Sequence, residues 1–114
     1  MAIIALGYLG IRSDKLDDWA DFAVKLLGMQ KIDRGARALA FRMDDRVQRL
    51  LVSDEPGDTL AFLGFEVSDQ DDLDHYAGRL DARGYKAEIG SAALAARRFV
   101  RSLIRFRDPG GNLV

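Results

Sequence analysis

The single histidine of the sequence, His75, is the first residue to consider for acid–base or metal chemistry. It lies in the stretch DQDDLDHYAGRL, four residues after Asp71 and four before Arg79, so a helix would place these three side chains on one face. The simplest interpretation is a solvated histidine beside carboxylates, and a catalytic His75 would need partners from a second chain. A site with two histidine ligands is excluded. The absence of cysteine excludes disulfides, thiolate ligands and cysteine nucleophiles.

Acidic side chains gather at two places where paired carboxylates could act in catalysis or bind a cation. Both places are the first turns of predicted helices, where the helix dipole already favours negative charge. Neither place has the glycine and the final glutamate of a calcium-binding loop. The two groups are Asp17, Asp18 and Asp21, and Asp69, Asp71, Asp72 and Asp74. We therefore predict no metal ion bound by this chain.

A basic run lies near the C-terminal end and consists of Arg97, Arg98, Arg101, Arg105 and Arg107. A strand would place the last three on one face, opposite Val100, Ile104 and Phe106. We interpret this face as solvated or as an interface; anion capture or contact with a further module is the alternative. Because the net charge is −1 and no aromatic residues interleave with the basic ones, neither nucleic acid nor an anionic membrane is indicated as a partner.

Two other features have simple explanations. The glycines of DPGGN suit a tight turn and lack the arrangement of a phosphate-binding loop. The serines have no histidine partner other than His75, so a serine triad has little support.

The elements that position these residues follow from periodicity. Residues 2–12 are apolar and predict a strand, and Ser13 or Asp14 can cap a helix after it. Gly28 stands where a left-handed residue would end that helix. The stretches MQKID, ALAFRM and RVQRLLV then predict three strands, with a turn on Asp44 and Asp45 between the last two. The predicted helix buries the stripe Leu16, Trp19, Ala20, Ala23, Leu26 and Leu27.

The same order of elements recurs from Thr59. TLAFLGFEV predicts a strand, Ser68 or Asp69 can cap the next helix, and Gly84 ends it. YKAEI and RSLIRFR predict two further strands before the DPGG turn. The helical stripe comprises Leu73, Tyr76, Ala77 and Leu80. We infer an internal duplication with halves of about 1–55 and 56–114, the second carrying GSAALAARRF as an insertion.

Each half then reads as βαβββ. The 114 residues, 48% of them apolar, predict one domain of the α+β class, in which paired βαβββ units form a curved mixed sheet with helices on its outer face. Alternation places Leu9 and Ile11, and their counterparts Leu63, Phe65 and Val67, under the helices. The opposite side carries the candidates for a ligand cavity, which are Tyr8, Arg12, Phe62 and Glu66, together with Gly10 and Gly64. Tyr8 and Phe62 either fill this side as core or form an aromatic-walled pocket for a flat apolar ligand.

Five stretches, LGYLGIRSD, DDWADFAVKLLGM, LAFLGFEVSD, LAARRFVRSLIRF and DPGGN, together resemble a known module. The module is the N-terminal one of type I extradiol ring-cleaving dioxygenases, above all the 2,3-dihydroxybiphenyl 1,2-dioxygenase group. These enzymes are members of the vicinal-oxygen-chelate (glyoxalase/bleomycin-resistance) superfamily, whose module is a paired βαβββ. The resemblance extends over essentially the whole chain.

The resemblance implies a division of labour between two modules. The C-terminal one holds Fe(II) through two histidines and a glutamate, and the N-terminal one lacks the metal. The superfamily's ligand positions correspond here to Tyr8, Phe62 and the position after Val114, whose counterpart in the first half is Leu51. A phenol, a phenyl ring and an alkyl group are poor ligands or none. We therefore expect no cofactor and no catalytic residue in this chain, and Fe(II) in a C-terminal module that lies beyond it.

From the resemblance we expect a last strand that is cut short and a chain that is the N-terminal part of a longer two-module protein. Its partners would be the C-terminal catalytic module, further copies of the protein and, for the whole enzyme, an aromatic diol. The alternative is a stand-alone small-ligand-binding protein of the bleomycin-resistance type that acts as a dimer. We expect a cytoplasmic protein, because cysteine is absent and no signal peptide or bilayer-spanning apolar run is present.

Overall fold

The computed structural model describes residues 3–33, 35 and 37–114. The chain divides into two compact units, one formed by Tyr8–Leu63 and the other by Met1–Gly7 with Gly64–Val114. Two long strands, β1 (Ala5–Arg12) and β5 (Thr59–Glu66), contribute residues to both units. No helix in the described part of the chain is long and apolar enough to span a bilayer.

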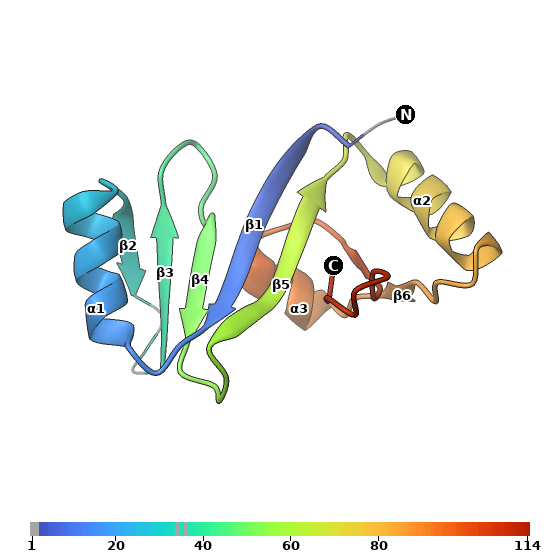
Figure 1. Ribbon diagram of the computed structural model, residues 1–114. Helices are drawn as coiled ribbons and strands as arrows, with labels where there is room; N and C mark the ends of the chain where they lie inside the picture. Colours follow the sequence, from blue (N-terminus) through green and yellow to red (C-terminus); the bar gives the residue numbers. More distant parts are fainter. Residues whose placement is uncertain (1–2, 34, 36) are drawn as a thin grey trace. The chain divides into compact units, whose positions relative to one another are not determined.

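A five-stranded sheet has the order β2-β3-β4-β1-β5 (Figure 1). Its short strands are β2 (Gln30–Asp33), β3 (Ala38–Arg42) and β4 (Leu50–Ser53). β4 pairs in parallel with β1, whereas β3 pairs in antiparallel fashion with both β2 and β4. The predicted α+β class with a curved mixed sheet is confirmed. The strand predicted at RVQRLLV begins four residues late, because Arg46–Arg49 belong to the loop before it.

One helix covers the sheet in the unit Tyr8–Leu63. It consists of α1 (Leu16–Asp21) and a π-helical turn, η1 (Phe22–Leu26). Ala23 lies in the core with Phe41, Leu50 and Val52, and Leu9, Ile11, Leu16 and Trp19 pack around that core. The alternation predicted for the first strand is therefore confirmed for Leu9 and Ile11.

The predicted cap of this helix is wrong. The N-cap residue is Lys15, which makes no side-chain capping hydrogen bond. The buried hydroxyl of Ser13 instead accepts the Lys15 backbone N–H at 3.1 Å, and the Ser13 N–H donates to the Ser53 carbonyl at 2.9 Å. Ser13 is thus held by β4, so the helix begins two residues later than a serine cap would allow.

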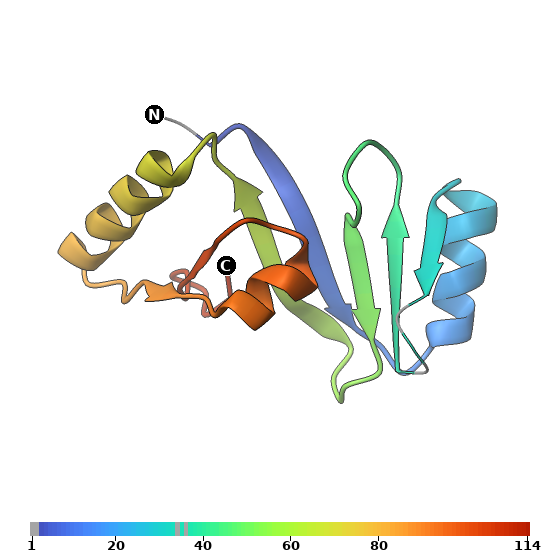
Figure 2. The ribbon, with the colours of Figure 1, turned by 180° about the vertical axis from the view of Figure 1, so that it is seen from behind.

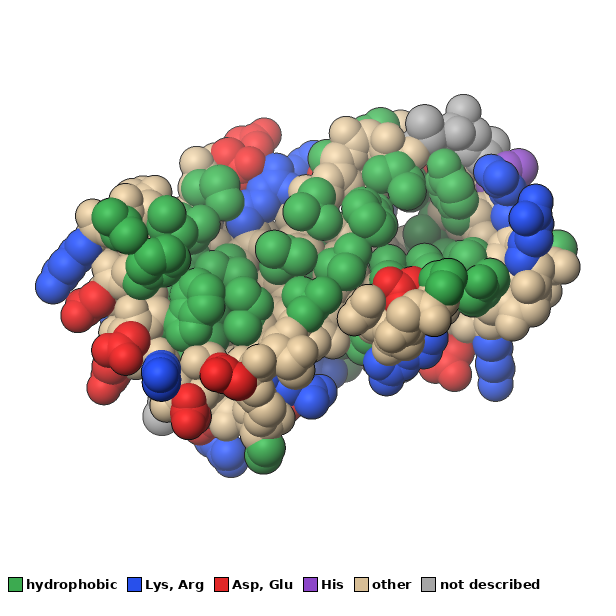
Figure 3. Space-filling view, viewed as in Figure 1, with side chains coloured by type: hydrophobic (Ala, Val, Ile, Leu, Met, Phe, Trp, Pro, Cys, Tyr) green, Lys and Arg blue, Asp and Glu red, His purple; other side chains and the backbone are tan. Residues whose placement is uncertain are grey.

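The end of the predicted apolar stripe is also wrong, because Leu26 and Leu27 are 71% and 50% exposed. The Leu27 N–H donates to the Phe22 carbonyl, which is the i→i+5 bond of a π-helix. The extra residue in this turn rotates the following side chains away from the face that carries Ala23. Figure 3 shows hydrophobic side chains gathered over the α1 end of this view. Gly28, at φ +72°, ends the helix as predicted.

The second unit contains α2 (Gln70–Ala82), which Asp69 caps by accepting the Asp72 N–H at 2.9 Å. The predicted stripe Leu73, Tyr76, Ala77 and Leu80 is the half-buried side of α2, and Gly84 follows the helix at φ +85°. Phe65 does not pack under a helix as predicted. Its side chain is 49% exposed.

The C-terminal part has less regular structure than the sequence predicts. The stretches YKAEI and RSLIRFR form only β6 (Glu88–Ile89) and β7 (Ile104–Arg105), which pair with each other. The insertion contains a helix that was not predicted, α3 (Ala92–Arg98), with Ser91 as its N-cap. Leu94 and Ala95 of α3 form a second small core with Leu103, and Figure 2 shows α3 beside the C-terminal segment.

Candidate functional site

Tyr8 on β1 and Phe62 on β5 lie in contact within the unit Tyr8–Leu63. Their ring centroids are 5.8 Å apart at an interplanar angle of 75°, an edge-to-face arrangement. Both side chains are half-buried. The sequence predicted that these two residues share one face of the sheet, and the structure brings them together there.

Phe62 also lies against the backbone of Gly10. A Cβ atom built on Gly10 would lie 2.3 Å from two atoms of the Phe62 ring and 2.6 Å from a third. No side chain fits at that distance, so this position must be glycine if the ring is to stay in place. The ring thus occupies the space above β1 where a cavity was considered.

Leu51 belongs to the same face as Gly10. It pairs with Gly10 in the parallel β1–β4 ladder and with Ala40 in the β3–β4 ladder. Its neighbours Leu50 and Val52 point into the core on the α1 side, so alternation turns Leu51 to the Tyr8 side. Tyr8, Leu51 and Phe62 offer no good ligand for a divalent cation, and Ala40 beside them is fully buried.

Arg12, the third candidate, forms an ion pair with Glu55. The Arg12 Nε lies 3.4 Å from Glu55 Oε2, and the side chains are 41% and 63% exposed. The Nε atom is itself buried and makes no hydrogen bond, because the carboxylate is near enough for a charge interaction but not aligned to accept the proton. Glu55 was not singled out from the sequence. The parallel pairing of Arg12 with Ser53 is what brings it close, and that pairing is not readable from periodicity.

Glu66, the fourth candidate, belongs to the other unit. Its backbone carbonyl accepts the Ile4 N–H at 2.9 Å, and its side chain is half-buried. The backbone of Glu66 thus joins the end of β5 to the segment that precedes β1.

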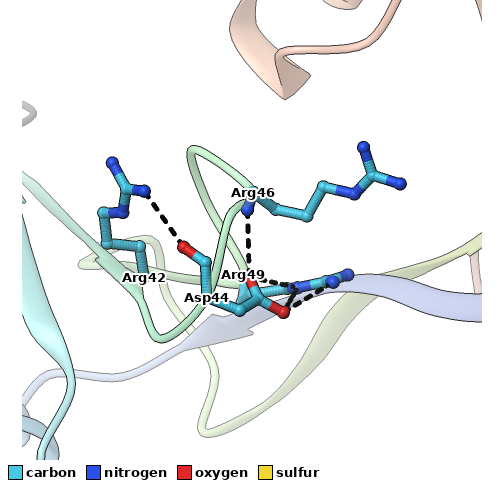
Figure 4. A network of polar contacts seen from close by, with 4 residues as sticks. All are labelled: Arg42, Asp44, Arg46 and Arg49. Atoms are coloured by element: carbon cyan, nitrogen blue, oxygen red, sulfur yellow. Dashed lines mark hydrogen bonds and ion pairs between the residues drawn. The ribbon is translucent and has the colours of Figure 1, made fainter.

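A polar network organises the loop between β3 and β4 (Figure 4). Asp44 Oδ1 accepts a hydrogen bond from Arg49 Nε at 3.1 Å, and Asp44 Oδ2 accepts one from Arg49 Nη2 at 2.7 Å, which makes the pair bidentate. The Arg46 backbone N–H donates to the same carboxylate, and Arg42 donates to the Asp44 carbonyl. Figure 4 shows the guanidinium groups of Arg42 and Arg46 pointing in different directions, so they do not converge on an anion site.

The hydrogen bond from the Arg49 side chain is the main reason that the pKa of Asp44 lies below its usual 3.8. The pKa of Asp108 in the DPGG turn is lowered as well, mainly because the Asn112 side chain and backbone donate to it at 3.1 Å and 2.8 Å. The sequence marked both residues as turn formers. It did not indicate that Arg49 pairs with Asp44, because the two lie on opposite arms of a loop whose length was predicted too short.

The remaining candidates do not assemble into a site. His75 is exposed on α2 and contacts Tyr76, with ring centroids 6.1 Å apart. Arg105 lies 3.7 Å from Glu88, and Arg107 donates to the Gly111 carbonyl, so these two members of the basic run have local partners. Only Ile104–Arg105 is strand, followed by an isolated bridge between Arg107 and Leu113, so the continuous strand predicted from Arg101 to Arg107 does not form.

Acidic residues do not form a metal site in the described part of the chain, where no group of three potential ligands comes together. An open depression at the start of α1 is lined by Asp14, Lys15, Leu16, Asp17, Asp18 and Asp54. Asp54 in this depression pairs with Arg37 at 3.1 Å.

Comparison with known proteins confirms the resemblance read from the sequence. The family model described as "Dihydroxybiphenyl dioxygenase BphC D1" matches residues 6–57. A biphenyl-2,3-diol 1,2-dioxygenase of Sphingomonas paucimobilis is 36% identical over 113 residues, which are 98% of this chain and 38% of that protein. A 3-methylcatechol 2,3-dioxygenase of Pseudomonas putida F1 is 38% identical over 114 residues, covering all of this chain and 39% of that protein.

Solved structures agree. A crystal structure of a catechol 2,3-dioxygenase superimposes with a TM-score of 0.93 and 37% identity, over 99% of this chain and 40% of that one. A crystal structure of BphC, a halotolerant catechol dioxygenase, gives a TM-score of 0.92 at 26% identity, over 97% of this chain and 38% of that one. The chain thus spans about two fifths of the length of the relatives it matches.

Proposed function

We propose that this chain is the non-catalytic N-terminal module of an extradiol dioxygenase whose full-length form cleaves catechol rings, of the 2,3-dihydroxybiphenyl type, next to the diol. The observation that carries the proposal is the pattern of coverage. Virtually the whole chain aligns, but only to 38–39% of relatives named as ring-cleaving dioxygenases. A module that supports a catalytic partner accounts for this pattern.

The chain's own residues do not fit the Fe(II) that such an enzyme uses. Extradiol chemistry needs a metal that holds both catechol oxygens and leaves a place for dioxygen. Tyr8, Leu51 and Phe62 cannot supply a facial set of nitrogen and carboxylate ligands, and Glu66 is a single carboxylate. The iron would therefore be bound by the part of the protein that follows this chain.

We assign a packing role to the Tyr8–Phe62 pair. The contact of the Phe62 ring with Gly10 and the burial of Ala40 support filled space rather than an open aromatic pocket. The other two candidates for the ligand cavity are Arg12, which pairs with Glu55, and Glu66 at the end of β5. We propose that these two residues stabilise the module. The cytoplasm is the compartment that suits a cysteine-free chain of this kind.

The alternative of a stand-alone dimeric ligand-binding protein is less well supported, because the relatives are named as dioxygenases and are more than twice as long. The size of the native gene product tests the proposal. An antibody raised against this chain should detect, in the source cells, a protein more than twice its length. A single native product of these 114 residues would contradict the proposal.

A further inference from the structure

The helix α1–η1 carries an exposed apolar surface on one flank. Phe22 and Leu26 follow each other at i and i+4, so they lie on the same side of the helix, and they are 45% and 71% exposed. Trp19, three residues before Phe22, packs against its ring edge-to-face, with the ring centroids 5.7 Å apart. We call Trp19, Phe22 and Leu26 the η1 patch. All three residues belong to the unit Tyr8–Leu63.

The exposure of the η1 patch follows from the geometry of the helix itself. Ala23 takes the core position, and the π-helical bond from the Leu27 N–H to the Phe22 carbonyl, at 3.1 Å, rotates Leu26 away from it. Single exposed apolar side chains are common, but adjacent ones on one flank mark an interaction surface. Figure 3 shows hydrophobic side chains together at the α1 end, with charged side chains around them.

The rim of the η1 patch is acidic at one end and basic at the other. The charged residues at the N-terminal end of α1, three acids and one lysine, are Asp14, Lys15, Asp17 and Asp18. Lys25 lies at the opposite end, in the last turn of η1. Lys31 follows on β2, where its pairing with the core residue Phe41 places it on the helix side of the sheet.

We propose that the η1 patch binds the η1 patch of a second copy of this chain, with the two helices antiparallel about a two-fold axis near Phe22. This inference concerns the chain itself and does not rest on the proposed function. A two-fold interface must be self-complementary. Asp18 lies about 6 Å before Phe22 along the helix and Lys25 about 4 Å after it, so antiparallel pairing sets Asp18 of one copy beside Lys25 of the other. Parallel pairing would instead set like charges together.

Charge supports a second copy as the occupant. A partner surface of one sign, or of no charge, would leave one end of the rim unmatched, whereas a second copy offers the opposite charge at both ends. Lys25 also pairs within its own chain, 3.4 Å from Asp21, but the two side chains are 77% and 72% exposed. Such an exposed pair is weak, so it does not prevent Lys25 from pairing with Asp18 of a second copy.

Charge reversal tests the pairing of the two copies. Sedimentation equilibrium on the unmodified chain should give a dimer and its dissociation constant. Asp18→Lys and Lys25→Asp should each raise that constant about tenfold or more, because each sets like charges together twice in the dimer. The double variant Asp18→Lys/Lys25→Asp restores opposite charges and should return to within about threefold of the unmodified chain. A double variant that binds no more tightly than the weaker single variant would overturn the proposal.

A second pair of variants tests the apolar contact. Leu26→Asp should dissociate the dimer, because it places a carboxylate in the centre of the interface. Val24→Asp is the matched control and should leave the dimer intact. Val24 lies in the same turn and is 41% exposed, but two residues from both Phe22 and Leu26 it faces another side of the helix. Circular dichroism should show that both variants are folded.

Two results would overturn the proposal. The first is a monomer of the unmodified chain at the highest attainable concentration, which would assign the η1 patch to a different partner. The second is equal dissociation by Leu26→Asp and Val24→Asp, which would show that the contact is not specific to the patch.

Discussion

The ring of Phe62 lies directly over Gly10, at a distance where no Cβ atom can be accommodated. The Phe62 ring of β5 packs against β1 because Gly10 has no side chain. The ring occupies space on the face of the sheet that carries Tyr8 and Leu51. The importance of this contact for stability can be tested by substitution.

Gly10→Ala should destabilise the fold by about 1–3 kcal/mol, because the new methyl group displaces the Phe62 ring. In the double variant Gly10→Ala/Phe62→Leu, the cost should be smaller than the sum of the two single costs by about 1 kcal/mol or more. Urea unfolding of the four proteins measures this coupling. Gly78→Ala is the control, since a Cβ there meets nothing within 4 Å, and it should stabilise α2 by about 0.5–1 kcal/mol. Strict additivity would show that the contact is unimportant.

Asp44→Asn should lower the free energy of unfolding at neutral pH, and the free energy of unfolding of the variant should change less as the pH falls. The pKa of Asp44 is depressed in the folded state, so its contribution is present above 3.8 and is lost as the pH falls toward the lowered pKa. The urea midpoints of the two proteins should therefore differ at pH 7 and converge at low pH. Asp45→Asn removes the neighbouring exposed charge and is the matched control. A gap between Asp44→Asn and the unmodified chain that stays constant with pH would refute the role of the Arg49 pair.

Phe99 ends α3 in a left-handed conformation, with φ 57° and ψ 43°. Here glycine should be preferred over alanine, so that Phe99→Gly is more stable than Phe99→Ala by about 1 kcal/mol. The comparison cancels the loss of the half-exposed ring, because both variants remove it. Ala96→Gly, within α3, should show the opposite preference, with a loss of about 1 kcal/mol. Thermal unfolding of these variants decides the point, and alanine superior to glycine at both positions would contradict it.

Metal titration should show no tight site. We expect no stoichiometric binding of Fe(II), Mn(II) or Zn(II) at micromolar or stronger affinity, because the single histidine and the residues Tyr8, Leu51 and Phe62 supply no ligand set. Isothermal titration calorimetry under anaerobic conditions measures this directly. A one-to-one isotherm would contradict the prediction. If it persisted in the variant His75→Ala, the ligands would be residues other than His75.

The sequence predicted the strands of the five-stranded sheet, both glycine-terminated helices and the shared face of Tyr8 and Phe62, because periodicity encodes which side of an element is buried. The strands predicted after Gly84 instead form a separate two-stranded sheet, β6-β7. The sequence did not predict the exposure of Leu26 and Leu27, since a π-helical turn arises from packing and leaves no periodic signal. The helix α3 was missed although Ser91 followed by AALAARR has the composition of a capped helix. Pairs such as Arg12–Glu55 and Arg49–Asp44 depend on strand pairing and loop length, which local patterns do not determine.

The central claim is that this chain supports a dioxygenase but does not carry out the reaction. Its most direct test compares the chain with the longer product of the same gene, both supplied anaerobically with Fe(II) and then given 2,3-dihydroxybiphenyl and dioxygen, while the yellow ring-opened product is followed by absorbance. We predict turnover by the longer protein and none by the chain alone. Turnover by the chain at a rate near that of the longer protein would contradict the assignment of Tyr8 and Phe62 as positions without ligand function, and with it the assignment of the module.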